Sequence, residues 1–387
     1  MNTRTCLKAA FASTLLLIST SAISSDSEDM QQQIDALKAE NKLIMERLDA
    51  SMDLIESNTG HGDNGGHGSS GKTTIGGYGE LHYASLDSGK EIDLHRFILF
   101  LGHEFSDRIR FFSELEVENA AVDTNGGEVA LEQAYIEFDV AESTSIRAGV
   151  LLVPMGIINE THEPPTFYGV ERNNIEKFII PSTWREGGVS ITGQLAQSFS
   201  YDVALHSGLQ TSSASDYAIR SGRRAVREAP AEDLALTARL KWTGIAGLEI
   251  GGAIQQQSDI TQSTDATAGS ATLIETHTVW QVQKFAVRAL YASWNLEGAG
   301  PASVGADKQS GWYIEPAYKL NEKWGLYARQ SSWDNQENSN NDTESTQTDF
   351  GFSYWPHEDV VIKANYQLLD RAGVNNDGFM LGVGYQF

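Results

Sequence analysis

Charged and large apolar side chains are mixed in one long segment, residues 154–188. Charges at the narrowest point of a channel attract ions of opposite sign and repel ions of the same sign, so they can select ions. The basic members of this segment would attract anions, and the acidic members would attract cations. The candidate constriction residues are Glu160, His162, Glu163, Arg172, Glu176, Lys177 and Arg185. In the alternative interpretation, these charges pair with one another and only shape the segment.

The same segment contains the apolar run Phe178, Ile179 and Ile180. A loop surrounded by water gains nothing from consecutive apolar side chains, whereas a loop folded onto other protein buries them. Long loops between regular elements are often functional. We therefore expect residues 154–188 to fold inward and to narrow the space that the rest of the chain encloses.

The sequence shows no convincing catalytic arrangement. His206 and Ser207 are adjacent, but neighbouring side chains of a strand point to opposite faces, so they cannot act as a base and its nucleophile. We expect no enzymatic activity, no cofactor and no resident metal. His61, Asp63 and His67 could hold a metal ion, yet they lie in a Gly- and Ser-rich stretch that is typical of a solvated tether.

Composition excludes several classes of protein. The chain has 52 acidic and 28 basic residues, so nucleic acid is not an expected partner. After the N-terminus, no apolar run is long enough for a helix that spans a membrane. The chain must therefore cross a membrane with strands, if it crosses one at all.

The N-terminal region differs in character from the rest. Basic residues Arg4 and Lys8 precede a short apolar run and then small residues, which predicts a signal peptide over residues 1–24. Residues 26–57 carry apolar residues at heptad spacing and predict a coiled-coil helix, for which self-association is favoured over a solitary helix lying on another surface. Residues 58–72 read as a flexible linker rich in Gly, Ser and His.

From residue 73 onward, apolar and polar residues alternate in many short stretches. A period of two indicates strands with one apolar face. The last stretch shows the pattern most clearly, because every second residue back from the end is large and apolar. These residues are Phe379, Leu381, Val383, Tyr385 and Phe387.

We count about sixteen strands of about ten residues, the length that crosses a hydrocarbon layer at a tilt. Short turns alternate with long polar loops, as in transmembrane barrels, and only a closed sheet leaves no unpaired edge in lipid. Residues 73–387 therefore predict an all-β fold, a transmembrane antiparallel β-barrel enclosing water. The candidate wall residues of its interior are Arg108, Arg110, Glu114, Glu116, Tyr135 and Glu137.

Three stretches resemble a known family. They are "LHRFILFLGHEFSDRIRFFSELEVE", "RAGVLLVPMGIINETHEPPTFYGVERN" and "IIPSTWREGG". With the signal peptide, coiled coil, linker and terminal Phe387, they resemble Gram-negative outer-membrane porins of the phosphate-selective porin O and P family. The resemblance implies a homotrimer whose third loop folds inward. It also implies that the barrel-assembly machinery recognises the C-terminal strand.

The resemblance and the residues together predict a porin in the Gram-negative outer membrane, with the coiled coil in the periplasm. Its expected partners are outer-membrane lipids and small hydrophilic solutes that diffuse passively, including anions such as phosphate. Acidic residues near Arg108 and Arg110 leave the ion preference open. The alternative is a structural or adhesive anchor with a blocked barrel and a periplasmic coiled coil.

Deletion of residues 29–57 tests the role assigned to the heptad segment. We expect the deleted protein to fold as a barrel but to assemble into oligomers that dissociate more readily, because the apolar heptad positions would supply interchain contacts. The measurement is oligomer dissociation temperature in detergent. An unchanged dissociation temperature contradicts the coiled-coil assignment.

Overall fold

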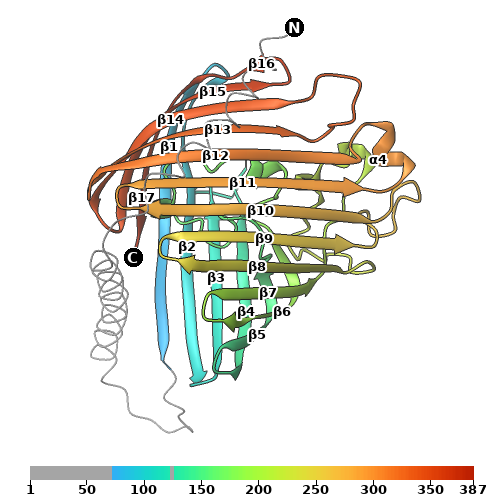
Figure 1. Ribbon diagram of the computed structural model, residues 1–387, viewed down its shortest axis with the longest axis horizontal. Coiled ribbons are helices and arrows are strands. Elements are labelled where there is room, and N and C mark those ends of the chain that lie inside the picture. Colours follow the sequence, from blue (N-terminus) through green and yellow to red (C-terminus); the bar gives the residue numbers. More distant parts are fainter. Residues whose placement is uncertain (1–71, 123–125) are drawn as a thin grey trace. The chain divides into compact units, whose positions relative to one another are not determined.

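The computed structural model describes residues 72–122 and 126–387. The predicted signal peptide and coiled-coil helix, and the linker up to residue 71, lie outside the described residues. Within the described residues, no helix has the length and apolarity needed to span a membrane. What is described consists almost entirely of strands and the loops that join them (Figure 1).

The strands of the first half are β1 (Thr73–Leu86), β2 (Gly89–Ser106), β3 (Ile109–Glu118), β4 (Val129–Ala141), β5 (Thr144–Leu152), β6 (Arg185–Ala196), β7 (Phe199–His206) and β8 (Ala235–Ile245). Those of the second half are β9 (Leu248–Gln257), β10 (Ala271–Val282), β11 (Phe285–Leu296), β12 (Lys308–Asn321), β13 (Trp324–Asp334), β14 (Ser345–His357), β15 (Val360–Arg371), β16 (Val374–Asn375) and β17 (Gly378–Gln386). The short β16 leads into β17, so the described residues form a closed antiparallel barrel of 16 strands. The predicted architecture is confirmed, with strand ends shifted by a few residues.

The barrel closes between its first and last strands. Strand β1 pairs with β2 on one side and with β17 on the other. At the seam, the backbone N–H groups of Gly77 and Phe387 each donate to the other residue's carbonyl oxygen at 2.9 Å. Because lipid offers no hydrogen bonds to a bare strand edge, this pairing satisfies the last backbone groups that would otherwise be unpaired.

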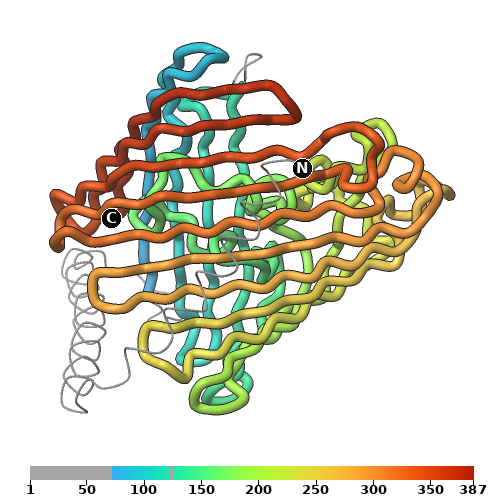
Figure 2. The backbone as a smooth tube through the Cα atoms, turned by 45° about the horizontal axis from the view of Figure 1, so that its top comes forward, coloured from blue at the N-terminus to red at the C-terminus, as the bar shows by residue number. Residues whose placement is uncertain are grey.

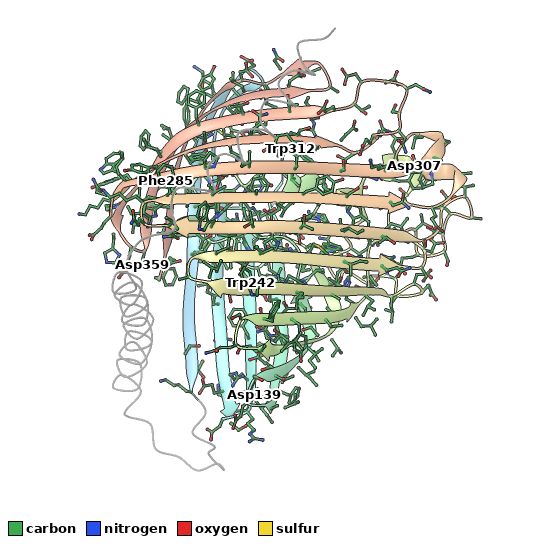
Figure 3. The ribbon with its side chains drawn as sticks, in the orientation of Figure 1. Asp139, Trp242, Phe285, Asp307, Trp312 and Asp359 are labelled. Carbon is green, nitrogen blue, oxygen red and sulfur yellow. The ribbon has the colours of Figure 1, made fainter. Side chains whose placement is uncertain are left out.

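Side chains alternate between the outside and the inside of the barrel, as the sequence pattern predicts. In β17, Phe379, Leu381 and Val383 are 43–46% exposed, whereas the intervening Met380 is only 7% exposed. Aromatic residues such as Phe285 and Trp312 also project from the outer surface (Figure 3). This apolar outer surface is suited to lipid, and the inner surface is lined mainly by polar residues.

The two ends of the barrel differ. One end has short turns, including those at residues 107–108 and 358–359, and the opposite end carries the longer loops. Asp359 and Asp307 mark these ends in Figure 3. The loop at residues 207–234 contains η2 (Ser213–Ser215) and η3 (Ile219–Gly222), and that at 297–307 contains α4 (Ala299–Ser303).

One loop does not stay at the rim. Residues 153–184, here called the inner loop, join β5 to β6 and contain η1 (Pro164–Thr166) and α3 (Ile175–Phe178). The inner loop, green in Figure 2, lies inside the ring of strands. Its helices contact strands on the other side of the ring, including β12, β13, β15 and β17.

A charge on the outer surface tests the lipid-facing assignment. Leu381→Arg should lower the free energy of unfolding in lipid vesicles by about 2–4 kcal/mol, because a cation near the middle of the bilayer loses its water. The same substitution at Asn341, an exposed residue of the loop between β13 and β14, is the matched control and should cost little. Equal losses for the two variants in urea unfolding would contradict the assignment.

Candidate functional site

The base of the inner loop is fixed by one buried amide. The Asn159 side chain donates from Nδ2 to the carbonyl oxygens of Val153 and Trp184, at 2.8 and 3.1 Å. Its Oδ1 accepts a hydrogen bond from the Trp184 backbone N–H at 2.7 Å. The Val153 N–H also donates to the Trp184 carbonyl at 2.9 Å. The loop therefore leaves the wall and returns to it at one closed stem.

A buried carboxylate organises the centre of the loop. Glu176 is 1% exposed, and its Oε1 accepts the backbone N–H groups of Ile157 and Ile158, each at 2.6 Å. Its Oε2 accepts from Asn173 at 2.8 Å and from the Tyr313 hydroxyl of β12 at 3.2 Å. Burial raises the pKa of Glu176, although these backbone donors oppose the shift. This residue ties two turns of the loop to the wall.

Apolar side chains of the loop form a core inside the barrel. Ile175, Ile179 and Ile180 are fully buried together with residues of the neighbouring loops and of the wall. Trp294 of β11 donates from its ring nitrogen to the Ile179 carbonyl at 2.8 Å, and Phe178 stacks on Trp333. The apolar run that the sequence shows is thus buried against the wall rather than exposed to water.

The tip of the loop is held by the inner faces of the last strands. Lys363 Nζ donates to the Gly169 carbonyl at 2.8 Å, and the Val170 N–H donates to Asn365 at 3.0 Å. Gly384 of β17 faces Pro164 so closely that a Cβ atom there would collide with the proline ring. Glycine in the terminal strand therefore gives room for the loop to contact the wall.

Most basic residues of the barrel wall are neutralised by carboxylates. Arg329 donates to Asp349 at 2.9 Å and lies 3.3 Å from Glu315. Arg96 contacts Glu80 at 2.5 Å. Further pairs of this kind join Arg110 to Glu137 and Asp139, Arg147 to Glu137, and Arg239 to Asp202 and Glu160. Such pairs contribute little net charge to the interior.

A second group of basic residues is arranged differently. Arg172 and Lys177 of the inner loop meet Arg220 and Arg223 of the loop at 207–234, and these four residues are here called the basic cluster. Arg220 donates to the Ser182 carbonyl at 2.8 Å, and Arg223 donates to the Thr183 carbonyl at 2.9 Å. Within the described part of the chain, no member of the basic cluster forms an ion pair with a carboxylate.

The members of the basic cluster repel one another. Burial, then Arg223 and Arg172, lower the pKa of Arg220. The protein around the Lys177 amine lowers its pKa although part of the side chain is exposed; Glu171 opposes this shift and Arg220 adds to it. Guanidinium groups remain protonated at neutral pH, so the repulsion persists until a negative charge enters. Three buried atoms in or next to the basic cluster have no hydrogen-bond partner among the described residues. They are Ser182 Oγ, Arg185 Nε and Arg223 Nε.

The predicted constriction residues lie in three different environments. Arg172 and Lys177 belong to the basic cluster, and Glu176 is the buried organiser of the loop. Glu160 pairs with Arg239, and His162 lies 3.1 Å from Glu132. Arg185 begins β6 and lies 3.5 Å from Glu132, while Glu163 is half-buried at the start of η1.

The predicted wall residues are dispersed over neighbouring strands. Glu114 and Glu116 are buried on β3, where Glu114 accepts from Gln133 at 2.8 Å. The strand register places Glu137, rather than Glu114, beside Arg110. Tyr135 lies under the Arg147 guanidinium group. Arg108 lies outside the wall, because β3 begins at Ile109 and Arg108 is exposed in the preceding turn.

Sequence reasoning did not identify several interior residues. Arg96, Arg239, Arg329 and Lys363 are almost completely buried and hold the inner loop or its neighbours. In the sequence, each of these four residues is visible only as a single basic residue on the polar face of a predicted strand. His206 and Ser207 do not meet: His206 contacts Thr237 at 2.9 Å, and Ser207 donates to Glu186 at 2.6 Å.

Solved structures with low sequence identity share this fold. The outer membrane channel DcaP of Acinetobacter baumannii is 13% identical, with a TM-score of 0.58 over 84% of this chain and 100% of that chain. An anion-selective porin from Comamonas acidovorans is 11% identical, with a TM-score of 0.58 over 82% and 100%. The trimer form of OmpT from Vibrio cholerae is 11% identical, with a TM-score of 0.55 over 82% and 99%.

Two sequence comparisons reach beyond the fold. An uncharacterized protein of Aquifex aeolicus (strain VF5) is 30% identical over 349 residues, which cover 81% of this chain and 80% of that protein. The family model described as phosphate-selective porin O and P matches residues 78–380. The match spans the barrel from β1 into β17 and includes the inner loop. The chain belongs to the phosphate-selective porin O and P family.

Proposed function

We propose that this outer-membrane porin lets small hydrophilic anions, phosphate among them, diffuse passively across the membrane. The observation that carries the proposal is the contrast between the two sets of basic residues. Most of those on the wall are paired with carboxylates, whereas the basic cluster contacts carbonyl and hydroxyl groups instead. Only charges without a counterion attract a mobile anion strongly.

The place of the basic cluster supports the same proposal. Two of its members lie on the inner loop inside the barrel, and Lys177 is exposed to solvent there. The other two lie on the loop at 207–234, whose Arg220 and Arg223 anchor onto Ser182 and Thr183. An anion that enters between these loops would relieve the mutual repulsion of several cations at once. A phosphate also suits arginine, whose N–H groups match its oxygens.

Assembly and location are proposals of the same kind. One solved structure of similar fold is described as a trimer form, and family resemblance implies a homotrimer. The signal peptide over residues 1–24 would direct export, and the helix over 26–57 would lie in the periplasm. Recognition of the terminal strand by the barrel-assembly machinery would complete insertion.

Removal of charge from the basic cluster tests the anion preference. The double variant Arg220→Gln and Arg223→Gln should lower the permeability ratio of anions to cations severalfold, corresponding to a change on the order of 1 kcal/mol in the relative barrier. Glutamine can still donate to the carbonyls of Ser182 and Thr183. The measurement is the reversal potential in a salt gradient across a planar bilayer.

The matched control is Arg224→Gln, which removes an exposed arginine from the same loop. We expect this variant to retain most of the wild-type selectivity. If the double variant shifts the reversal potential no more than Arg224→Gln does, the basic cluster is not the source of selectivity. Bilayers that show no conductance for the wild-type protein would instead support a blocked anchor.

Disruption of the central carboxylate tests whether the inner loop constricts the channel. Glu176→Ala leaves the Ile157 and Ile158 N–H groups without their acceptor, which costs about 1–3 kcal/mol for each buried group. We expect the inner loop to become susceptible to proteolysis, and the single-channel current to fluctuate more, while the barrel stays folded. Limited proteolysis and bilayer recordings measure these effects.

Glu163→Ala provides the control within the same loop. The Glu163 carboxylate has no hydrogen-bond partner among the described residues, and only its carbonyl oxygen accepts, from Thr166. Its removal should therefore leave protease resistance and current noise close to the wild type. Equal behaviour of the two variants would show that Glu176 does not organise the loop.

A further inference from the structure

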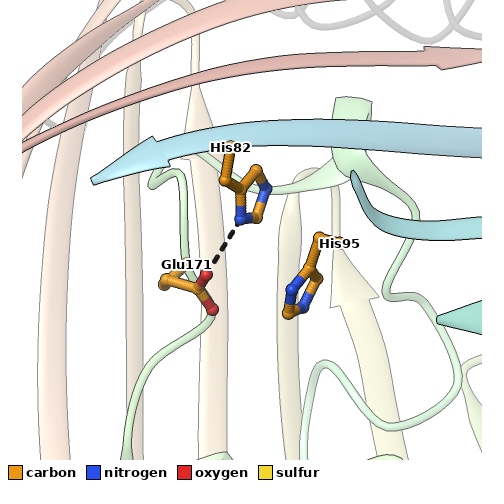
Figure 4. Close-up of side chains that lie close together, drawn as sticks. All are labelled: His82, His95 and Glu171. Atoms are coloured by element: carbon orange, nitrogen blue, oxygen red, sulfur yellow. Dashed lines mark hydrogen bonds and ion pairs between the residues drawn. The ribbon is translucent and has the colours of Figure 1, made fainter. Parts of the chain in front are cut away.

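Two histidines of adjacent strands and a carboxylate of the inner loop meet on one side of the barrel interior. They are His82 of β1, His95 of β2 and Glu171 of the inner loop (Figure 4). One ligand atom of each residue lies within 4.8 Å of the other two. His82 Nδ1 lies 2.9 Å from Glu171 Oε1, and the two imidazole rings stack with centroids 4.7 Å apart.

Each histidine is oriented by a second carboxylate. The Nε2 atom of His82 lies 3.1 Å from Glu80, which is itself held by the Arg96 Nε–H at 2.5 Å. The Nδ1 atom of His95 lies 3.3 Å from Asp93. Metal-binding histidines characteristically use one ring nitrogen for the metal and the other for a carboxylate or carbonyl, which fixes the ring. His82 has Glu171 at one ring nitrogen and Glu80 at the other, and the Asp93 contact leaves Nε2 of His95 for an ion.

The two histidines lie among carboxylates. Three carboxylates, those of Glu80, Asp93 and Glu171, contact the two imidazole rings, and Glu80 also accepts from the Arg96 guanidinium group. Lys363 of the wall interacts electrostatically with Glu80 and Glu171, but its hydrogen bond goes to the Gly169 carbonyl at 2.8 Å.

The site is accessible from the barrel interior. The side chains of His95 and Glu171 are 29% and 35% exposed, whereas His82 is buried behind them. An ion could therefore reach the ligands without unfolding the wall. Two imidazoles with one carboxylate suit zinc, copper or nickel, whereas magnesium and calcium prefer oxygen ligands alone.

We propose that His82, His95 and Glu171 form a binding site for a divalent transition metal such as Zn²⁺ or Cu²⁺. A bound ion would connect the inner loop to β1 and β2, because Glu171 is the loop ligand and both histidines belong to the wall. Binding itself does not depend on which solutes the channel passes, so the site goes beyond the proposed anion function.

The other carboxylate and histidine groups are less suitable. Glu114, Glu132 and His162 also lie together, but they supply one imidazole, and Arg185 already places a cation 3.5 Å from Glu132. His357, Glu358 and Asp359 are consecutive residues of an exposed turn. The group of Glu114, Glu132 and His162 is thus already neutralised in part by Arg185, and the group of the exposed turn serves as a comparison in the experiment.

Metal titration of the full-length protein in detergent tests the proposal. We expect isothermal titration with ZnCl₂ to show one saturable site per chain that is lost or weakened at least tenfold in His95→Gln and in Glu171→Gln. Electron paramagnetic resonance with CuCl₂ should report two coordinating imidazole nitrogens in the wild type and one in His95→Gln. Asp93→Asn, which leaves all three ligands, should weaken binding about tenfold.

Control variants separate this site from other histidines of the chain. Binding should survive in His357→Ala and in the double variant His61→Ala and His67→Ala, which remove the turn and linker histidines. Each variant is first shown to be folded by circular dichroism, and Asp93→Asn serves if a ligand variant does not fold. Unchanged binding in His95→Gln or Asp93→Asn, or loss of binding in the linker variant, would overturn the proposal.

Discussion

The structure depends on the requirement that every backbone N–H and C=O group in a lipid environment has a partner within the protein. For a sheet, this requirement can be met only if the first and last strands pair, as β1 and β17 do through their register from Tyr78 with Gln386 to Leu86 with Gly378. The outer surface can then be apolar and the inner surface polar. Because the sheet closes on itself, the polar inner faces of its strands enclose a single space.

Closure of the barrel leaves interior space, and the inner loop fills part of this space. A polar ring of this size leaves an interior that the wall side chains do not have to fill. The inner loop occupies part of it with its own apolar core of Ile175, Ile179 and Ile180, and Glu176 satisfies its buried N–H groups. Small residues on the receiving wall, such as Gly384, allow the loop to approach. One face of β17 is thus suited to contact lipid, and the other face contacts the inner loop.

The strands could be predicted from sequence because their signal is local. In β17, each outward residue is separated by one position from the next, so Phe379, Leu381 and Val383 reveal the strand without knowledge of its neighbours. Burial of the run from Phe178 to Ile180 was predictable for the same reason. The pairing of charges was not, because Arg110 meets Glu137 only through the register between β3 and β4.

Contacts between loops were the least predictable part of the candidate site. Arg220 and Arg223 read as a basic run in a long loop, and nothing in that run indicates Ser182 and Thr183 as their partners. His82 and His95 likewise lie on separate strands, and Glu171 comes from a distant loop, so no spacing motif joins them. The expectation of no resident metal considered only the linker residues His61, Asp63 and His67, and not these strand and loop residues.

The inner loop also links the two sites proposed here through adjacent residues. Glu171 points to His82 on the wall, and Arg172, a member of the basic cluster, donates to Thr183. Because the two residues share a peptide unit, a change that fixes or releases the Glu171 side chain restricts or frees the backbone that positions Arg172. An ion held by Glu171 would also place positive charge near the basic cluster, which strengthens the attraction for anions. Metal binding and anion passage would thus be coupled within one short segment, although the ligands of each site come from different strands and loops.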